Sequence, residues 1–245
     1  MHLPDGFLSL PVATATTAAV VLGGSVLCRS LRSDGVVPVS HRALLAGFVL
    51  AAQMTNFPVL PGVSGHMMGA TLAAILLGPV AATVTLAGVL TFQCFVLHDG
   101  GISALGANLL NMAVAGVWSG WVAYRLAGGE KRPLLATALA GWVSVMMGTI
   151  FCSIELVLSS TAPASLIFPA MVGAHAVIGL AEGLLSAVVV TMLRPNVDAS
   201  ASPAWGRQAW CTLFGLAFLA ALLAPFSCDL PDGLESVLQI IGRVR

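Results

Sequence analysis

Charged side chains are scarce in this sequence. Asp, Glu, Lys and Arg make up 8% of its 245 residues, and ten acidic and ten basic residues cancel to a net charge of zero. An ordinary soluble domain carries about a quarter charged residues, so the polar surface that a soluble globule of this size needs is missing. The charge balance also provides no basic patch for nucleic acid. The composition therefore excludes an ordinary soluble domain.

Several sequence signals are missing as well. No GxxxxGK[ST] loop is present to cradle ATP phosphates, and no HExxH, GxSxG or pair of aspartates in an apolar run indicates an enzyme. The five cysteines form no CxxC pair and are expected to be small core residues. Because no basic region and cleavage site mark a signal peptide, we expect the mature chain to begin at Met1 with a free amine.

Long apolar runs are abundant instead, with 58% hydrophobic residues and a mean hydropathy of +0.98. Apolar segments separated by Gly and Pro breaks predict helices over 8–31, 42–57, 64–77, 79–97, 107–126, 134–158, 169–193 and 210–226. A bilayer core is about 30 Å thick, and the segment 64–77 is short for a crossing. We therefore predict an all-α integral membrane protein, a seven-helix bundle with one additional C-terminal transmembrane helix. The predicted domains are a membrane domain over 1–195, a polar linker over 196–206 and a tail over 207–245.

The basic residues orient these helices. Eight of the ten Lys and Arg residues lie in or beside the loops after the first, fifth and seventh helices, whereas the loops 59–63, 98–106 and 159–168 contain none. Basic loops favour the cytoplasmic side. We therefore expect a multi-pass protein of the cytoplasmic (inner) membrane whose N-terminus lies on the outer side, together with the loop that carries His66.

The first two residues, Met1 and His2, offer three nitrogens in a row. These are the amine of Met1, the backbone amide nitrogen of His2 and its Nδ1, which together close a five-membered and a six-membered chelate ring. A planar set of nitrogens suits Ni²⁺ or Cu²⁺, with Co²⁺ also possible. An imidazole is the expected fourth donor, and His66 is the best placed, with His98 and His175 as weaker candidates. The turn that follows His2 would fold these residues back toward the bundle.

Other polar residues lie within apolar runs, where each needs a partner or a function. Interhelical hydrogen bonds are the simplest explanation for most of them, namely Gln53, Gln93, Asn108, Asn111 and Glu155. His175 and Glu182 are seven residues apart and share a helix face, so they could form a proton or ion pair or simply pack between helices. Two alternatives stay open on these residues: an intramembrane metal-dependent enzyme, and a proton-coupled metal permease that uses Glu155 and Glu182.

Four stretches resemble one family. MHLPDGF at the start, GVSGHMMGATLAAILLGPVAA (62–82), HDGGISALGANLLNMAVAG (98–116) and HAVIGLAEGLLSA (175–187) are similar to the CbiM/NikM family over about residues 1–195. Members are the substrate-capturing (S) membrane components of energy-coupling-factor transporters for cobalt and nickel. The resemblance implies that Met1, His2 and His66 are the metal ligands. His98 departs from the family pattern, and its role is left open.

The resemblance also implies partners. A transmembrane coupling subunit (CbiQ/NikQ-like) and ATPase subunits (CbiO/NikO-like) are expected to supply the energy, so this chain would be no enzyme and would need no cofactor besides its transported Ni²⁺ or Co²⁺. PDGLE (231–235) resembles the small PDGLE/NikN-like region that is often fused to such components, and a separate NikN/CbiN-like subunit is a further possible partner. The tail is shorter than in related proteins, which leaves its accessory role open. Nitrogen ligands favour nickel over cobalt, and the oligomeric state is not determined by the sequence.

Overall fold

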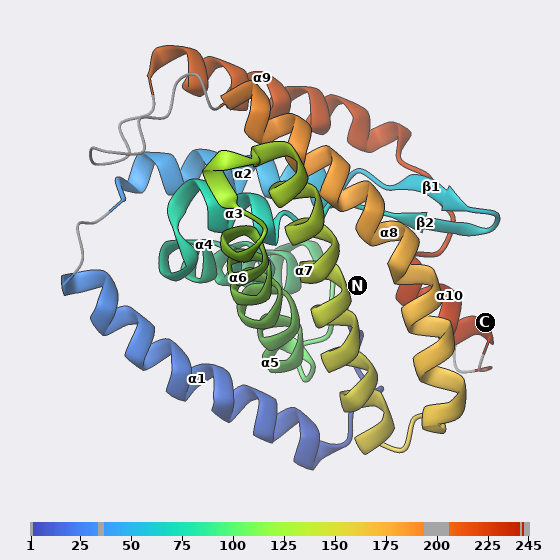
Figure 1. Cartoon of the computed structure of the whole chain (residues 1–245). Helices are drawn as coiled ribbons and strands as arrows, with labels where there is room; N and C mark the ends of the chain where they lie inside the picture. Colours follow the sequence, from blue (N-terminus) through green and yellow to red (C-terminus); the bar gives the residue numbers. More distant parts are fainter. Residues whose placement is uncertain (1, 34–36, 194–205, 241, 243–245) are drawn as a thin grey trace.

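The computed structural model describes residues 2–33, 37–193, 206–240 and 242. Helices dominate these residues, and the longest two, α7 and α8, run through the centre of the molecule (Figure 1). The elements in chain order are α1 (Leu10–Ser33), α2 (Val39–Gln53), β1 (Phe57–Leu60), β2 (Val63–Gly65), α3 (Ala70–Leu77), α4 (Pro79–Phe92), η1 (Gln93–Leu97), α5 (Leu105–Asn108), η2 (Leu109–Gly116), α6 (Val117–Leu126), η3 (Gly129–Lys131), α7 (Pro133–Leu158), α8 (Ala164–Leu193), α9 (Arg207–Leu223), η5 (Ala224–Phe226) and α10 (Gly233–Ile240).

The helices confirm the general prediction of a helical, multi-pass membrane protein. Within the described residues, five helical stretches are long and apolar enough to cross a membrane: Leu10–Leu27, Pro79–Leu97, Pro133–Leu158, Ala164–Leu193 and Arg207–Phe226. Helices α2 and α3 contain 15 and 8 residues, fewer than the about 20 that a crossing requires. The count of seven helices plus one therefore stays a prediction.

The predicted helix over 64–77 is wrong in its first part. Residues 57–65 form the antiparallel β1–β2 hairpin, in which Phe57 pairs with Gly65, and α3 begins only at Ala70. Gly62 and Gly69 both adopt positive φ, of 78° and 76°, a conformation that other residues reach at a cost and that ends regular helix. The helix expected over 42–57 likewise ends at Gln53, before the hairpin.

Helices α7 and α8 pack closely because glycines face each other. A Cβ on Gly141 would lie 2.6 Å from the Cα of Gly183, so a larger residue at either position would push the helices apart. Helix α8 begins at Ala164, five residues before the predicted start at 169, and holds Pro169 within it. Membrane helices tolerate such an internal proline when neighbouring groups satisfy the freed carbonyl.

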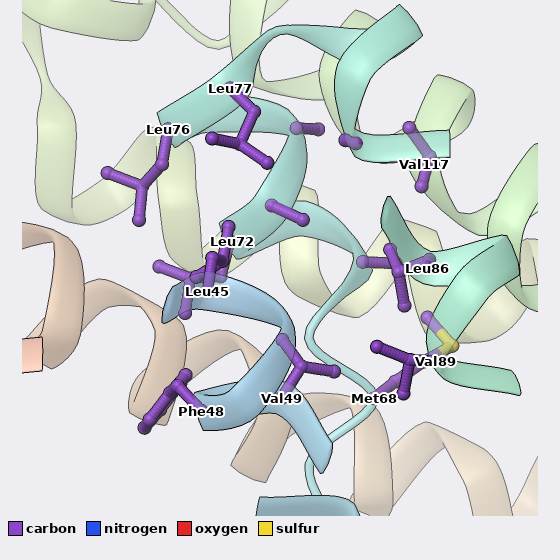
Figure 2. Packing of buried hydrophobic residues seen from close by; sticks show 14 of the residues in the cluster. Leu45, Phe48, Val49, Met68, Leu72, Leu76, Leu77, Leu86, Val89 and Val117 are labelled. Atoms are coloured by element: carbon purple, nitrogen blue, oxygen red, sulfur yellow. The ribbon is translucent and has the colours of Figure 1, made fainter. Parts of the chain in front are cut away.

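The main apolar core fixes the start of α3. Leu45 and Val49 of α2 lie toward α3 and the loop that carries Met68, as Figure 2 shows, whereas Phe48 points to the other side of α2. A Cβ on Gly69 would lie 2.9 Å from Val49. This packing holds the four-residue loop 66–69 between the hairpin and α3, and His66 is its first residue.

Two helices lie at the periphery, α1 on one side and α9 on the other (Figure 1). Only 11% of the apolar window of each is buried, and their outer faces carry exposed large side chains such as Val21, Leu22, Phe214 and Phe218. In a membrane these faces would contact lipid. The predicted linker over 196–206 lies, except for Gly206, outside the described residues.

Candidate metal site

The strap, defined here as residues 2–7, enters the molecule through a fully buried leucine. Leu3 packs in a cluster with Ala107 and Leu156. Its backbone N–H donates to Asn108 Oδ1 at 2.8 Å, and Asn108 Nδ2 donates to the Leu3 carbonyl at 3.1 Å. Gly101 N–H donates to the same carbonyl at 2.8 Å. The side-chain amide of Asn108 thus hydrogen-bonds both backbone groups of Leu3, the residue next to His2.

Asp5 fastens the strap to the loop 98–104. Its carboxylate accepts hydrogen bonds from the Ser103 hydroxyl at 2.5 Å, from the Ser103 N–H at 2.7 Å and from the Ile102 N–H at 3.2 Å. These bonds lower the pKa of Asp5, the Ser103 hydroxyl contributing most. Gly101 permits the contact, because a Cβ there would overlap the Asp5 backbone. The loop that contains DGG (99–101) therefore holds the strap in place.

The strap brings His2 to His66. The two imidazole rings are stacked, with centroids 5.6 Å apart and planes inclined by 15°. Burial lowers the pKa of His2 to about 3, and burial also lowers that of His66. Both rings are therefore neutral near pH 7, which is the form that binds metal ions.

The two ring nitrogens of His2 have different surroundings. Nδ1 of His2 lies 3.3 Å from Asp99 Oδ1, whereas Nε2 is buried without a hydrogen-bond partner among the described residues. Nδ1 is the atom that the predicted chelate requires. Binding of a metal there would replace the contact with Asp99 and leave that carboxylate beside the ion. Met1, the remaining predicted ligand, lies outside the described residues.

Two buried side chains hold the loop that carries His66. Glu182 of α8 accepts from the Met68 N–H at 2.7 Å and from the Gly69 N–H at 2.9 Å, and Gln53 Nε2 donates to the Met68 carbonyl at 2.8 Å. Sequence reasoning assigned Gln53 to helix packing and left Glu182 between a proton pair and packing. The structure shows that both position the His66 loop.

The PDGLE tail packs beside the same loop. Ser64, in strand β2, donates its N–H to the Pro231 carbonyl at 2.9 Å and its hydroxyl to the Leu230 carbonyl at 2.6 Å. Asp232 begins α10 by accepting from the Glu235 N–H at 2.8 Å, and Glu235 accepts in return from the Asp232 N–H at 3.0 Å. This reciprocal arrangement is a capping box, so the motif has a structural role at the start of α10.

Asp232 is charged and lies near the histidines of the site. Burial alone would raise its pKa, but nearby positive charge and the hydrogen bond from the Glu235 N–H lower the pKa below its usual range. The next residue, Gly233, lies against His175, because a Cβ there would come within 2.9 Å of the imidazole Cε1. The carboxylate of Asp232 is therefore ionised at neutral pH, close to the imidazoles of His66 and His175.

Two cavities adjoin His66. The inner cavity has a volume of about 20 Å³ and is lined by Gly65, His66, Met68, Met112, Val145, His175, Ile178, Asp232 and Gly233. The outer cavity, called the vestibule below, has a volume of about 300 Å³ and is lined by His2, Gln53, Met54, Asn56, His66, Leu97, Asp99, Asp232 and Glu235. His66 and Asp232 thus lie where the two spaces meet.

The other sequence candidates have different surroundings. His98 is exposed, with a φ of 56°, and does not line either of these cavities. His175 Nδ1 is 2.8 Å from the Met171 carbonyl. Asn111 donates to Glu155 at 2.7 Å, as expected of an interhelical bond. His175 and Glu182 therefore have separate partners, and the pairing considered for them is not seen.

Within the part of the chain that the structure describes, no three His, Cys, Asp or Glu side chains come close enough to hold a metal ion. A chelate that uses the amine, a backbone nitrogen and two imidazoles needs no such cluster. Sequence reasoning assigned no specific role at the site to Asp5, Asp99 or Asp232. The signal that they share is a glycine directly after each aspartate.

Comparison with known proteins shows the family of this chain. Residues 2–199 match the family described as CbiM, the cobalt uptake substrate-specific transmembrane region. The chain belongs to the CbiM family. The resemblance noted for residues 1–195 is thereby confirmed.

Relatives extend the match into the tail. A putative fused nickel transport protein NikMN of Archaeoglobus fulgidus is 39% identical over 99% of this chain and 83% of its own length. The fused nickel transport protein NikMN of Rhodobacter capsulatus is 32% identical, with 91% of this chain and 72% of the relative covered. Such fused relatives support a NikN-like identity for the tail.

A solved structure supports the fold. The crystal structure of a truncated transition metal transporter superposes with a TM-score of 0.72 at 31% identity, covering 80% of this chain and 99% of that one. A second structure, of a transition metal transporter, gives the same TM-score at 32% identity and covers 80% of this chain and 93% of the other.

Proposed function

We propose that this chain is the substrate-binding membrane component of an ATP-driven energy-coupling-factor importer for Ni²⁺ or Co²⁺. The observation that carries the proposal is the stacking of His2 on His66, two neutral imidazoles separated by 64 positions in the chain and brought to 5.6 Å. Membership of the CbiM family and the nickel and cobalt transport names of its relatives support the choice of substrate.

The proposed ligands are the amine of Met1, the backbone nitrogen and Nδ1 of His2, and an imidazole nitrogen of His66. Nitrogen donors in a plane suit Ni²⁺, and the general affinity order also places Co²⁺ below Ni²⁺. The ion would replace protons on the amine and the amide, so binding releases protons. The side chain of Asp99 would then balance part of the charge of the bound ion.

Energy for transport is proposed to come from partner subunits. A coupling subunit resembling CbiQ or NikQ and ATPase subunits resembling CbiO or NikO would move the bundle and release the ion inward. The sequence contains no phosphate-binding loop of the GxxxxGK[ST] type. With the N-terminus on the outer side of the cytoplasmic membrane, as the basic loops suggest, the vestibule would receive ions from outside the cell.

Equilibrium dialysis of the purified protein against Ni²⁺ tests the ligand assignment. His66→Ala removes one donor outright and should weaken binding by about tenfold or more, since the loss of a ligand costs at least 1.4 kcal/mol. His98→Ala is the matched control, because it removes an exposed imidazole that does not line the vestibule. Equal affinities for His66→Ala and the unaltered protein would contradict the proposal.

A further inference from the structure

The vestibule is rich in hydrogen-bond acceptors. Asp99 and Glu235 contribute carboxylates, and Gln53 and Asn56 contribute amide oxygens. Gln53 is 3% exposed, and its Nε2 must face the Met68 carbonyl to which it donates, which fixes the direction of the amide. Its Oε1 has no partner among the described residues, and the same is true of Asn56 Oδ1. Buried acceptors without donors indicate that a donor is to be supplied.

The volume of the vestibule sets the size of that donor. On this measure of cavity volume one water molecule needs about 10–15 Å³, so six need about 60–90 Å³, and the vestibule offers about 300 Å³. The inner cavity, with about 20 Å³, has room for a single water molecule. A divalent cation with its whole first hydration shell therefore fits the vestibule and does not fit further in.

The charge of the vestibule and its access to solvent also suit a hydrated cation. Waters bound to a divalent cation are strong donors and offer no acceptors to the wall, and carboxylates and amide oxygens are their natural partners. Met54, Leu97 and Glu235 are exposed at the rim, so the space can be reached from solvent. Negative charge in such a recess raises the local concentration of cations.

Given the proposed transport function, on which this inference rests, we propose that the vestibule is a separate first binding site for the intact hydrated cation. The ion is held there through its water molecules by Asp99, Glu235 and the amide oxygens of Gln53 and Asn56. It then loses those waters to solvent as the nitrogens of His2 and His66 replace them. Capture and dehydration thus take place in two adjoining sites.

This proposal gives the tail a function. Asp232 and Glu235 both come from PDGLE and form one wall of the vestibule, while Asp99 comes from the loop after η1 and Gln53 from α2. The hydrogen bonds of Ser64 to Pro231 and Leu230 fix this wall beside the His66 loop. The fused tail completes the capture site.

The test uses hexaamminecobalt(III), a cation of similar size and shape to a hydrated divalent ion. Its six ammonia ligands exchange too slowly for the protein to replace them, so it can occupy a site only through hydrogen bonds and charge. We expect it to bind purified protein at one saturable site in equilibrium dialysis at low ionic strength and to slow the binding of Ni²⁺ competitively.

The variant Glu235→Gln removes one charge of the vestibule and keeps an oxygen for the capping bond to Asp232. It should weaken binding of the probe by about fivefold or more, because a trivalent ion is sensitive to each carboxylate close by. Asp229→Asn is the matched control: the same charge change at an exposed position in the same segment, outside both cavities. It should change binding of the probe less than twofold.

Saturating Ni²⁺ provides the check on folding, because Glu235→Gln leaves the proposed nitrogen ligands in place and should bind the same final amount of Ni²⁺. Absence of saturable probe binding to the unaltered protein, or equal weakening in the two variants, would overturn the vestibule proposal. Failure of the unaltered protein to bind Ni²⁺ would instead overturn the proposed function. The two failures are distinguishable because the probe cannot enter the chelate.

Discussion

Asn108 is expected to control metal affinity although it is not a proposed ligand. Its side chain accepts from the Leu3 N–H and donates to the Leu3 carbonyl, at 2.8 and 3.1 Å. Asn108→Ala removes both bonds. The Leu3 carbonyl keeps the bond from Gly101, but its N–H, on a fully buried residue, loses this partner.

The cost can be assessed from these contacts. The bond to the carbonyl contributes about 1 kcal/mol, and leaving the buried N–H unsatisfied costs about 1–3 kcal/mol, so the docked strap should lose about 2–4 kcal/mol. Because Asp5 continues to hold the strap, only part of this loss appears in binding. We expect the dissociation constant for Ni²⁺ to rise by about 10-fold to 100-fold.

Equilibrium dialysis with Ni²⁺ measures the effect, and thermal unfolding of the metal-free protein accompanies it. Asn111→Ala is the matched control, since it removes a buried amide of the same helical run that bonds Glu155 at 2.7 Å instead of the strap. It should lower thermal stability and leave Ni²⁺ affinity within about twofold. Unchanged affinity in Asn108→Ala, or the same loss in both variants, would refute the role of Asn108.

Three further outcomes follow from the same contacts. Asp5→Asn should weaken Ni²⁺ binding in dialysis, because a neutral acceptor bonds the Ser103 and Ile102 donors less strongly than a carboxylate; an affinity equal to that of the unaltered protein would contradict this. Gly101→Ala should release the strap, since its Cβ would overlap the Asp5 backbone, and faster proteolysis near the N-terminus would show it, whereas native protection would count against it. Acid should also release the strap: the pKa of His2 falls from 6.5 to about 3 on burial, so the undocked strap binds more protons between those values and docking weakens as pH falls below about 6.5. Strap protection in hydrogen exchange that is constant from pH 7 to pH 4.5 would contradict that sign.

The sequence predicted the membrane class and the two histidines that meet, for identifiable reasons. Apolar runs are long enough to be read directly, and α1, α7, α8 and α9 each lie within a few residues of a predicted segment. The pairing of His2 with His66 was predicted from chelate chemistry and from the family resemblance. The distance between the two rings then follows from the strap and the loop.

The hairpin and the surroundings of the site could not be predicted in the same way. Residues 64–69 directly precede an apolar run and were predicted as part of its helix, which the positive φ of Gly62 and Gly69 interrupts. The contacts of Glu182 with the His66 loop, and of Asp5 with residues 102 and 103, join segments about 100 positions apart. No local pattern marks such contacts, because they depend on how α8 and the DGG loop pack.

The central claim is that the amine at the start of the chain is a metal ligand, and an N-terminal extension tests it directly. A four-residue Gly-Ser extension ahead of Met1 removes the amine from the chelate and leaves every side chain unchanged. One added residue would be unsuitable, since a histidine at the third position can form a planar nitrogen chelate by itself. The same four residues placed after Arg245 provide the matched control.

Uptake of radioactive Ni²⁺ by cells that also express the ATPase and coupling partners is the measurement, with equal amounts of each variant confirmed in the membrane. The account predicts that the N-terminal extension abolishes uptake and Ni²⁺ binding while the C-terminal extension retains both. Native uptake and affinity in the N-terminally extended protein would contradict the chelate and place the metal site elsewhere in the bundle.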